Sequence, residues 1–267
     1  MKINYQETTA DLMKRIEIHN QYGGRNIDDW MLQLLKLTPG MKILDVACGS
    51  GKQVFLFYHQ LKGAVDITGG DVSKELLEQA RREAEQSQVK AQFLELDFNQ
   101  PFEFPDNLFD LLSCCFAIYY ATDIPFTICE MHRVLKPGGR LFTSGPMPQN
   151  KQVFYDIIRE ATQSKPLPLM PGSSRYNSDI LKTLQSIFSR VEVHIFENPL
   201  TFTRPEPFLE YTRASLSEDR KLWGDFFQDK DDFERIMGQI EAVTRKRIEQ
   251  DSKLVMTKVV GGFIATK

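Results

Sequence analysis

Two aspartates and two glycines between residues 41 and 71 have the types and spacing of a nucleoside-binding site. Asp45 ends a short apolar run, and Gly49 and Gly51 follow it in a turn of small residues. Glycines let the backbone approach a ligand closely, because a Cβ atom there would collide with it. Asp71 lies 20 positions after Gly51. A carboxylate at that distance can accept hydrogen bonds from both hydroxyls of a ribose.

Alternating strands and helices must position these residues. The pattern predicts a strand over 43–46, a helix from Lys52 and a second strand over 65–70. Strand, small-residue turn and helix together form the first unit of a doubly wound α/β sheet. The carboxylate of Asp45 would repel a diphosphate and suits a cationic group such as an α-ammonium. Considered alone, this stretch also fits a dehydrogenase or a tight turn without a ligand.

Three separated stretches resemble the class I S-adenosylmethionine-dependent methyltransferases. Residues 45–51 (D-V-A-C-G-S-G) resemble the first motif, D/E-x-G-x-G-x-G, with Ala47 in place of its first glycine. Residues 109–112 (F-D-L-L) resemble the fourth motif, and residues 133–141 (R-V-L-K-P-G-G-R-L) resemble the pattern R-V-L-K-P-G-G-x-L. The resemblance covers residues 41–145 well and the rest loosely, and it extends to quinone-biosynthesis and natural-product methyltransferases.

The resemblance implies an α/β fold with a Rossmann-like, doubly wound, seven-stranded sheet whose last strand is antiparallel. It also implies N-terminal helices and a helical insert before the last strand. We expect a single methyltransferase domain over 1–267, divided by role: an N-terminal helical segment closing the cofactor site (1–40), a cofactor-binding core (41–145), substrate-side helices with a lid (146–250) and the last strand (251–267).

The implied cofactor is S-adenosyl-L-methionine, with S-adenosyl-L-homocysteine as product. The residues expected to bind it come from the strand ends and the N-terminal segment: Asp45, Ala47, Gly49, Gly51, Asp71, Val72, Asp97, Phe98, Cys115, Phe116, Tyr22 and Arg25. The resemblance puts Asp97 beside the adenine amino group and the backbone of Phe98 near the ring. Tyr22 and Arg25 would contact the methionyl carboxylate or the acceptor, although an ordinary turn with a solvated arginine explains them equally well.

Methyl transfer from a sulfonium is an in-line displacement, so the protein contributes mainly positioning and exclusion of water. The side chains expected to line the acceptor pocket are Tyr119, Tyr120, Arg175 and Tyr176. The first two stand where many relatives carry histidines, and the last two end a proline-rich loop over 164–176 that we expect to form a lid. No catalytic base is assigned, because all four histidines lie on predicted helices or strands. The methylated atom (O, N or C) stays open.

The aromatic residues of the expected lid over 164–176 and of the helical insert over 198–228 favour a small molecule with an apolar body as the acceptor. The net charge of -3 gives no basic surface, so nucleic acid is not expected as a partner.

No apolar run approaches the roughly 18 residues of a membrane span, and the N-terminus lacks the apolar core of a signal peptide. We therefore expect a cytoplasmic protein. The spacing of the four cysteines matches no zinc site, so no metal is expected and the thiols are read as reduced and structural.

Two other functional classes stay open at this point. A nicotinamide-dependent oxidoreductase would have to place a diphosphate beside Asp45, and it would leave the Lys-Pro-Gly-Gly turn at 136–139 unexplained. A non-catalytic S-adenosylmethionine-binding module is conceivable because no base is evident. Neither the acceptor nor the oligomeric state follows from the sequence.

Overall fold

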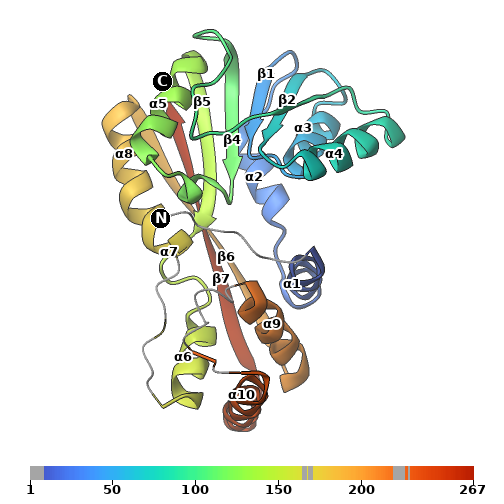
Figure 1. The fold of residues 1–267 in the computed structure, drawn as a ribbon, viewed down its shortest axis with the longest axis vertical. Coiled ribbons are helices and arrows are strands. Elements are labelled where there is room, and N and C mark those ends of the chain that lie inside the picture. Colours follow the sequence, from blue (N-terminus) through green and yellow to red (C-terminus); the bar gives the residue numbers. More distant parts are fainter. Residues whose placement is uncertain (1–8, 164–166, 168–170, 219–225, 228) are drawn as a thin grey trace. The chain divides into compact units, whose positions relative to one another are not determined.

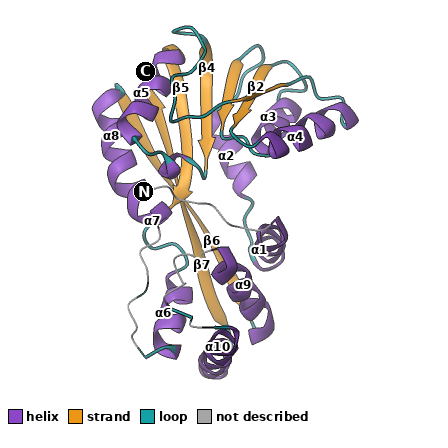
Figure 2. Ribbon diagram, viewed as in Figure 1, coloured by secondary structure: helices purple, strands orange, loops and turns teal. Residues whose placement is uncertain are grey.

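A computed structural model describes residues 9–163, 167, 171–218, 226–227 and 229–267 (Figures 1 and 2). Within them one sheet has seven strands in the order β3-β2-β1-β4-β5-β7-β6. The strands are β1 Lys42–Val46, β2 Asp66–Asp71, β3 Gln92–Glu95, β4 Phe109–Cys115, β5 Leu135–Pro146, β6 Arg190–Phe202 and β7 Leu254–Thr266. Strands β1 to β5 pair in parallel, and β7 pairs antiparallel with β5. The predicted Rossmann-like sheet with its antiparallel last strand is confirmed.

Helices alternate with the strands along the chain. They are α1 Thr9–Tyr22, α2 Ile27–Leu35, α3 Lys52–Gln60, α4 Lys74–Gln86, α5 Ile124–Val134, α6 Gln152–Ala161, α7 Pro171–Arg175, α8 Leu181–Ile187, α9 Pro205–Glu218 and α10 Lys230–Asp251, with a 3₁₀ turn at Ile118–Tyr120 and a π-helical turn at Tyr176–Ile180. Side-chain caps explain where two of these helices begin. The hydroxyl of Ser73 accepts from the backbone of α4, and the carboxylate of Asp123 accepts from that of α5. Ser73 was the predicted cap.

The chain divides into two compact units, with β6 and β7 contributing residues to both. The first unit comprises Met1–Asn26, Gln149–Met170 and Glu197–Val259, and the second comprises Ile27–Pro148, Pro171–Phe196 and Val260–Lys267. Each has its own apolar core. In the part of the chain that the structure describes, no helix is long and apolar enough to cross a membrane.

The second unit contains the parallel strands and the three stretches that carry the family resemblance. Strand β4 lies between β1 and β5, and its apolar side chains from Phe109 to Cys114 are almost fully buried. This burial explains why its sequence does not alternate, since a central parallel strand is covered on both faces. Helix α4 contacts β2 and β3, and α5 packs against α8 (Figure 1).

The first unit is a helical layer on the ends of two long strands. Helices α1 and α9 pack together, and α10 contacts both α6 and α9. The inward face of α6 carries Phe154, Ile157 and Ile158, which are at most 1% exposed. Apolar side chains from all four helices therefore share one core with β6 and β7.

Three local predictions were wrong. The segment over 136–139, expected as a turn before the fifth strand, lies inside β5. The pairing of β5 with β4 shifts in register there, and Gly138 has a positive φ. The expected loop over 164–176 is helical from Pro171 on, and its last residue, Tyr176, is fully buried in the core. Residues 198–202, expected in a helical insert, continue β6, whose buried and exposed positions alternate there. Residues 164–166 and 168–170 of that loop, and Trp223 of the insert, lie outside the described residues.

Replacing Gly51 by alanine should destabilise the fold. Gly51 has φ +89°, and an added Cβ would lie 2.9 Å from the Phe55 ring and 3.2 Å from the Phe93 ring. Left-handed backbone at a non-glycine residue costs about 1–3 kcal/mol. We expect the free energy of unfolding in urea to fall by that amount. As a control, Gly238→Ala in α10, where nothing lies within 4 Å, should leave it equal or slightly higher, since alanine favours helix. Equal effects of the two variants would contradict this.

Candidate cofactor site

The predicted cofactor residues of the second unit gather at the carboxyl ends of the parallel strands. Asp45, near the end of β1, is in register with Gly69 on β2 and Ser113 on β4. The direction in which strands are added to the sheet reverses at β1. The chain continues from β1 to β2 and β3 on one side, and β4 and β5 lie on the other side. Open α/β sheets bind their ligands outside the strand ends at such a switch point.

Asp45 is a buried carboxylate with one unsatisfied oxygen. Its side chain is 1% exposed, and Ser113 Oγ donates a hydrogen bond to Oδ1 at 2.5 Å. Its Oδ2 is buried and has no hydrogen-bond partner among the described residues. Burial raises the pKa of Asp45 to about 7; the charge of Asp71 adds to this rise, and the hydrogen bond from Ser113 opposes it. A buried carboxylate oxygen without a hydrogen-bond partner can bind a hydrogen-bond donor or a cationic group of a ligand.

Asp71 organises the turn that follows β1. Its Oδ2 accepts a hydrogen bond from the backbone N–H of Gly49 at 2.8 Å, and its Oδ1 accepts one from Ser73 at 2.8 Å. A carboxylate has about four lone-pair sites, so both oxygens keep the capacity to accept from a ligand hydroxyl. The carboxylate thus holds the glycine turn and can still meet a ribose.

Four residues at this edge of the sheet have a left-handed backbone. Ala47, Gly49, Gly51 and Phe116 all have positive φ angles, of +57°, +55°, +89° and +56°. A Cβ at Gly49 would approach only a terminal methyl of Leu76, at 4.0 Å. The space in front of Gly49 is therefore open, whereas that around Gly51 is filled by aromatic rings. The φ of Ala47 gives a physical reason for glycine at this place in the family motif, and alanine tolerates it at a cost of about 1–2 kcal/mol.

The other predicted cofactor residues of the second unit occupy nearby loops. Val72 is 58% exposed directly after Asp71, and Phe116 is 41% exposed directly after β4. Cys115, the last residue of β4, has its sulfur 3.8 Å from that of Met31. Asp97 accepts from Asn99 through the backbone at 2.8 Å and the side chain at 2.9 Å, which forms a tight turn after β3. The carbonyl of the next residue, Phe98, accepts a hydrogen bond from the Thr127 hydroxyl at 2.9 Å.

The predicted acceptor residues form one packed group in the same unit. The rings of Tyr119 and Tyr120 lie 4.7 Å apart, and Tyr119 also meets the Tyr176 ring edge-on at 6.4 Å. Arg175 donates to the carbonyls of Tyr119 at 2.7 Å and Ala121 at 3.0 Å. Tyr176 is 0% exposed and stacks on Phe263 at 4.4 Å. Arg175 and Tyr176 thus tie the segment after α7 to the 3₁₀ turn and the core.

Tyr22 and Arg25 belong to the first unit. The ring of Tyr22 packs 5.2 Å from that of Phe202. Arg25 donates to the carbonyl of Glu197 at 2.9 Å, and its backbone N–H donates to Asn198 at 3.2 Å. These contacts fasten the end of α1 to β6, and a role for either side chain at the cofactor stays a prediction.

Sequence reasoning missed Ser113 and the second role of Ser73. Ser113 interrupts an apolar strand (F-D-L-L-S-C-C), and a lone hydroxyl in a buried strand signals a polar partner on the neighbouring strand. Ser73 was predicted only as a helix cap, and its backbone also donates to Asp71. Register between strands, which the sequence does not reveal, is needed to pair Ser113 with Asp45.

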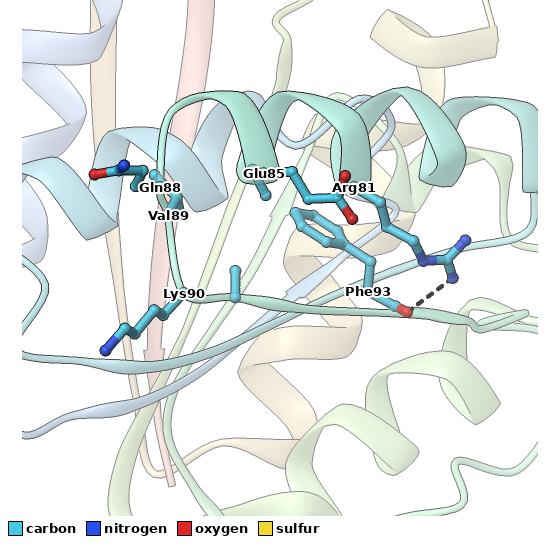
Figure 3. Close-up of a pocket in the computed structure, with 8 residues that line it drawn as sticks. Arg81, Glu85, Gln88, Val89, Lys90 and Phe93 are labelled. Carbon is cyan, nitrogen blue, oxygen red and sulfur yellow. Dashed lines mark hydrogen bonds between the residues drawn. The ribbon is translucent and has the colours of Figure 1, made fainter.

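The groove shown in Figure 3 is separate from this site. It lies between the last turns of α4 and the start of β3, where Arg81 donates to the carbonyl of Phe93 at 2.9 Å. None of the predicted site residues lines it. Over the described residues, no group of His, Cys, Asp or Glu could hold a metal ion.

Cys129 should react with a thiol reagent faster than the other three cysteines. All four cysteines are free, and Cys129 is the exposed one. Burial raises the pKa of Cys48, Cys114 and Cys115, that of Cys115 to about 12, and the thiolate is the reactive form. We expect an aromatic disulfide reagent to titrate one thiol in the folded protein and four in denaturant. A Cys129→Ser variant should lose the fast phase; rapid reaction of a second thiol would contradict the burial described here.

Part of the chain is similar to known methyltransferases. Residues 43–139 match the family model described as a methyltransferase domain. A demethylmenaquinone methyltransferase of Symbiobacterium thermophilum is 41% identical over 103 residues, which cover 38% of this chain and 41% of the relative. A demethylmenaquinone methyltransferase of Thermus thermophilus is 34% identical over 131 residues, which cover 49% of this chain and 58% of the relative. The chain spans about half the length of the curated relatives it matches.

A solved structure extends the likeness in fold beyond the matched core. The YcgJ protein of Bacillus subtilis superposes with a TM-score of 0.59 at 16% identity, covering 90% of this chain and 97% of that one. The matched residues contain Asp45, the glycine turn, Asp71 and the Lys-Pro-Gly-Gly segment. Residues 43–139 therefore form a methyltransferase domain, and over this part of the chain the sequence is similar to that of the demethylmenaquinone methyltransferases.

Proposed function

We propose that the protein transfers a methyl group from S-adenosylmethionine to a small molecule. The observation that carries this proposal is the buried, unsatisfied Oδ2 of Asp45 beside a glycine turn held by Asp71. A sulfonium cofactor with an α-ammonium group supplies the cation that this oxygen lacks, and its ribose supplies hydroxyls to Asp71. A dinucleotide would bring a diphosphate toward a carboxylate instead, so the nicotinamide alternative has no support.

The residues present fit the cofactor class. Asp45 would hold the ammonium group, Asp71 the ribose, and the exposed side chain of Val72 would border the nucleoside. Asp97 and Phe98, at the end of β3, would meet the adenine. Bound there, the cofactor supplies an activated methyl group on a good leaving group.

The chain's contribution to the reaction is then positioning and exclusion of water. Phe116, Tyr119 and Tyr120 follow β4 and would align the acceptor with the methyl group. No general base is assigned, so an acceptor that is already ionised or carbanion-like is the simplest choice. A whole-chain domain organisation, with 1–40 closing the cofactor site and 146–250 on the substrate side, is part of this proposal.

A quinone precursor is the acceptor to test first, because the relatives named above methylate demethylmenaquinone by name. The aromatic side chains at Tyr119 and Tyr120 suit a ring with an apolar body. C-methylation needs a carbanion-like ring carbon, which the reduced quinol provides without a protein base of unusual strength. This choice of acceptor remains a proposal.

The experiment is transfer of tritiated methyl from S-adenosylmethionine to a panel containing reduced demethylmenaquinone analogues, phenols and amines. Product label with equimolar S-adenosylhomocysteine supports the proposal, and the labelled product identifies the methylated atom. If the cofactor binds but no acceptor in a broad panel turns over, the non-catalytic binding module replaces the enzyme.

A further inference from the structure

One edge of the sheet in the second unit is open and apolar. Strand β6 is the last strand in the sheet order, so one of its two edges has no neighbouring strand among the described residues. Over Arg190–Phe196, the part of β6 in the second unit, Val193 is 45% exposed and Ile195 is 41% exposed. Side chains alternate between the two faces of a strand, so Val191 lies on the same face as these two. The three side chains form an apolar row along an open strand.

Other parts of the sheet border carry features that hinder pairing with another strand. The opposite edge strand, β3, has only four residues, Gln92–Glu95. In the first unit, the continuation of β6 contains Pro199, and Leu200 forms a β-bridge to Gly23. A short edge strand, a proline and a covering segment each hinder edge-to-edge association. Arg190–Phe196 is longer than β3, contains no proline and, among the described residues, forms no isolated β-bridge.

The two faces of this stretch of β6 differ in chemistry. On the face opposite to the apolar row, Phe196 is 3% exposed, and its ring lies 5.3 Å from that of Trp30 on α2. The charged and basic side chains of the stretch share that face by alternation. Glu192 lies 3.5 Å from the guanidinium of Arg190 and 3.8 Å from Nε2 of His194. One face is therefore packed and polar toward its end, and the other is apolar and exposed.

The sequence of this stretch is complementary to a second copy of itself. In an antiparallel pair with a two-fold axis at Val193, that residue faces its equivalent, and Val191 faces Ile195. Glu192 then faces His194 on each side of the axis. Opposed apolar side chains stabilise such a pair, and an imidazole can donate a hydrogen bond to a carboxylate. An axis at Glu192 would instead oppose two carboxylates, which destabilises a strand pair.

We propose that β6 pairs with β6 of a second copy over Arg190–Phe196, which gives a symmetric dimer with one continuous sheet. An antiparallel pair centred on Val193 uses the whole open stretch, because Arg190 and Phe196 then face each other at its two ends. The backbone groups of an edge strand supply the hydrogen bonds between the copies. Two-fold contacts of this kind, made by the same surface of both subunits, are the commonest in homo-oligomers. The inference does not depend on methyl transfer.

The first test is sedimentation velocity of the purified chain at concentrations from about 1 to 200 µM, a range that suits a small interface of one strand pair. We expect reversible conversion from the 30.8 kDa of one chain to twice that mass. Val193→Lys opposes two ammonium groups at the axis and should raise the dimer Kd about 100-fold or more. Thr201→Lys, at an exposed position of β6 in the first unit, should leave the Kd unchanged. A wild-type chain that stays monomeric, or equal dimerisation by the two variants, overturns the proposal.

A second measurement locates the axis by oxidative cross-linking, with Cys129→Ser as background because Cys129 is the exposed native thiol. Val193→Cys places two thiols directly opposite each other, with Cβ atoms about 5 Å apart, so we expect a disulfide-linked dimer. Ile195→Cys is the matched control. It is similarly exposed, but its equivalent lies four residues farther along the strand pair, roughly 14 Å away, and it should not cross-link. Equal cross-linking at the two positions, or at neither, would contradict a pair centred on Val193.

Discussion

Replacing Asp71 by asparagine is expected to raise the Kd for S-adenosylmethionine about 100-fold or more. The carboxylate holds Gly49 and Ser73 at 2.8 Å each and is the proposed acceptor of both ribose hydroxyls. Hydrogen bonds to a charged group are worth about 1.5–3 kcal/mol each, and 2.7 kcal/mol corresponds to a factor of 100. Calorimetric titration of the purified variant gives the Kd directly.

The matched control for Asp71→Asn is Asp66→Asn on the same strand. Asp66 begins β2 at its amino end, is exposed, and pairs with Lys42 at 2.8 Å. The same change of chemistry there should leave the Kd for S-adenosylmethionine within about twofold, since exposed ion pairs contribute little. An equal loss of affinity in both variants would mean that the strand as a whole had been disturbed, and an unchanged Kd in Asp71→Asn would remove Asp71 from the site.

Asp45→Asn is expected to weaken cofactor binding and to stabilise the ligand-free protein. Burial raises the pKa of Asp45 from its ordinary 3.8 to about 7. The folded chain then binds this proton more tightly than the unfolded chain, so the contribution of Asp45 to stability falls as pH rises from about 4 to 7. At pH 8 the carboxylate costs up to about 4 kcal/mol, which asparagine avoids. Urea unfolding at pH 5 and pH 8 measures the difference.

The same titration predicts how the affinity of the wild-type protein depends on pH. A cationic ammonium group pairs with ionised Asp45, so below pH 7 a proton must leave before binding. We expect the Kd for S-adenosylmethionine to rise toward tenfold for each unit below the pKa of about 7, and the Kd of Asp45→Asn to be higher and flat over pH 5.5 to 7.5. A flat wild-type profile would show that Asp45 does not pair with the cofactor.

Asp110→Asn serves as the control for Asp45. Asp110 lies near the start of β4, and although burial acts to raise its pKa, hydrogen bonds from Lys136 and from the backbone of Lys42 lower it. Its ionised form therefore stabilises the fold above its ordinary pKa, and asparagine there should reduce stability at pH 8 without changing the Kd. The two substitutions are thus expected to change stability in opposite directions.

The sequence was sufficient to predict that Asp45, the glycines and Asp71 lie at one edge of the sheet, because the signals there are local. Asp45, the glycines and Asp71 stand at fixed distances along one strand-turn-helix-strand unit. The last strand was predicted within 251–267, and the observed strand β7, Leu254–Thr266, lies inside these bounds. Strand β6 lies within the segment over 146–250 that was expected to hold substrate-side helices, although its buried and exposed positions alternate from Phe196 to Phe202.

Features that depend on contacts between distant segments could not be predicted. Ser113 meets Asp45 only through strand register. Tyr176 resembles a polar lid residue in a proline-rich stretch, yet its ring is stacked on Phe263 and its hydroxyl is hydrogen-bonded to Thr143. Tyr211 of α9 contacts the ring of His19 in α1 and accepts a hydrogen bond from Lys258 of β7, and no spacing in the sequence relates these residues.

The most direct test of the cofactor assignment is calorimetric titration of the purified chain with S-adenosylmethionine, S-adenosylhomocysteine and NADH. We predict one site per chain for each adenosyl compound, no heat of binding with NADH, and loss of the first two signals in Asp71→Asn but not in Asp66→Asn. Binding of NADH, or of the adenosyl compounds with equal affinity to both variants, would contradict a cofactor site at the carboxyl ends of β1 and β2.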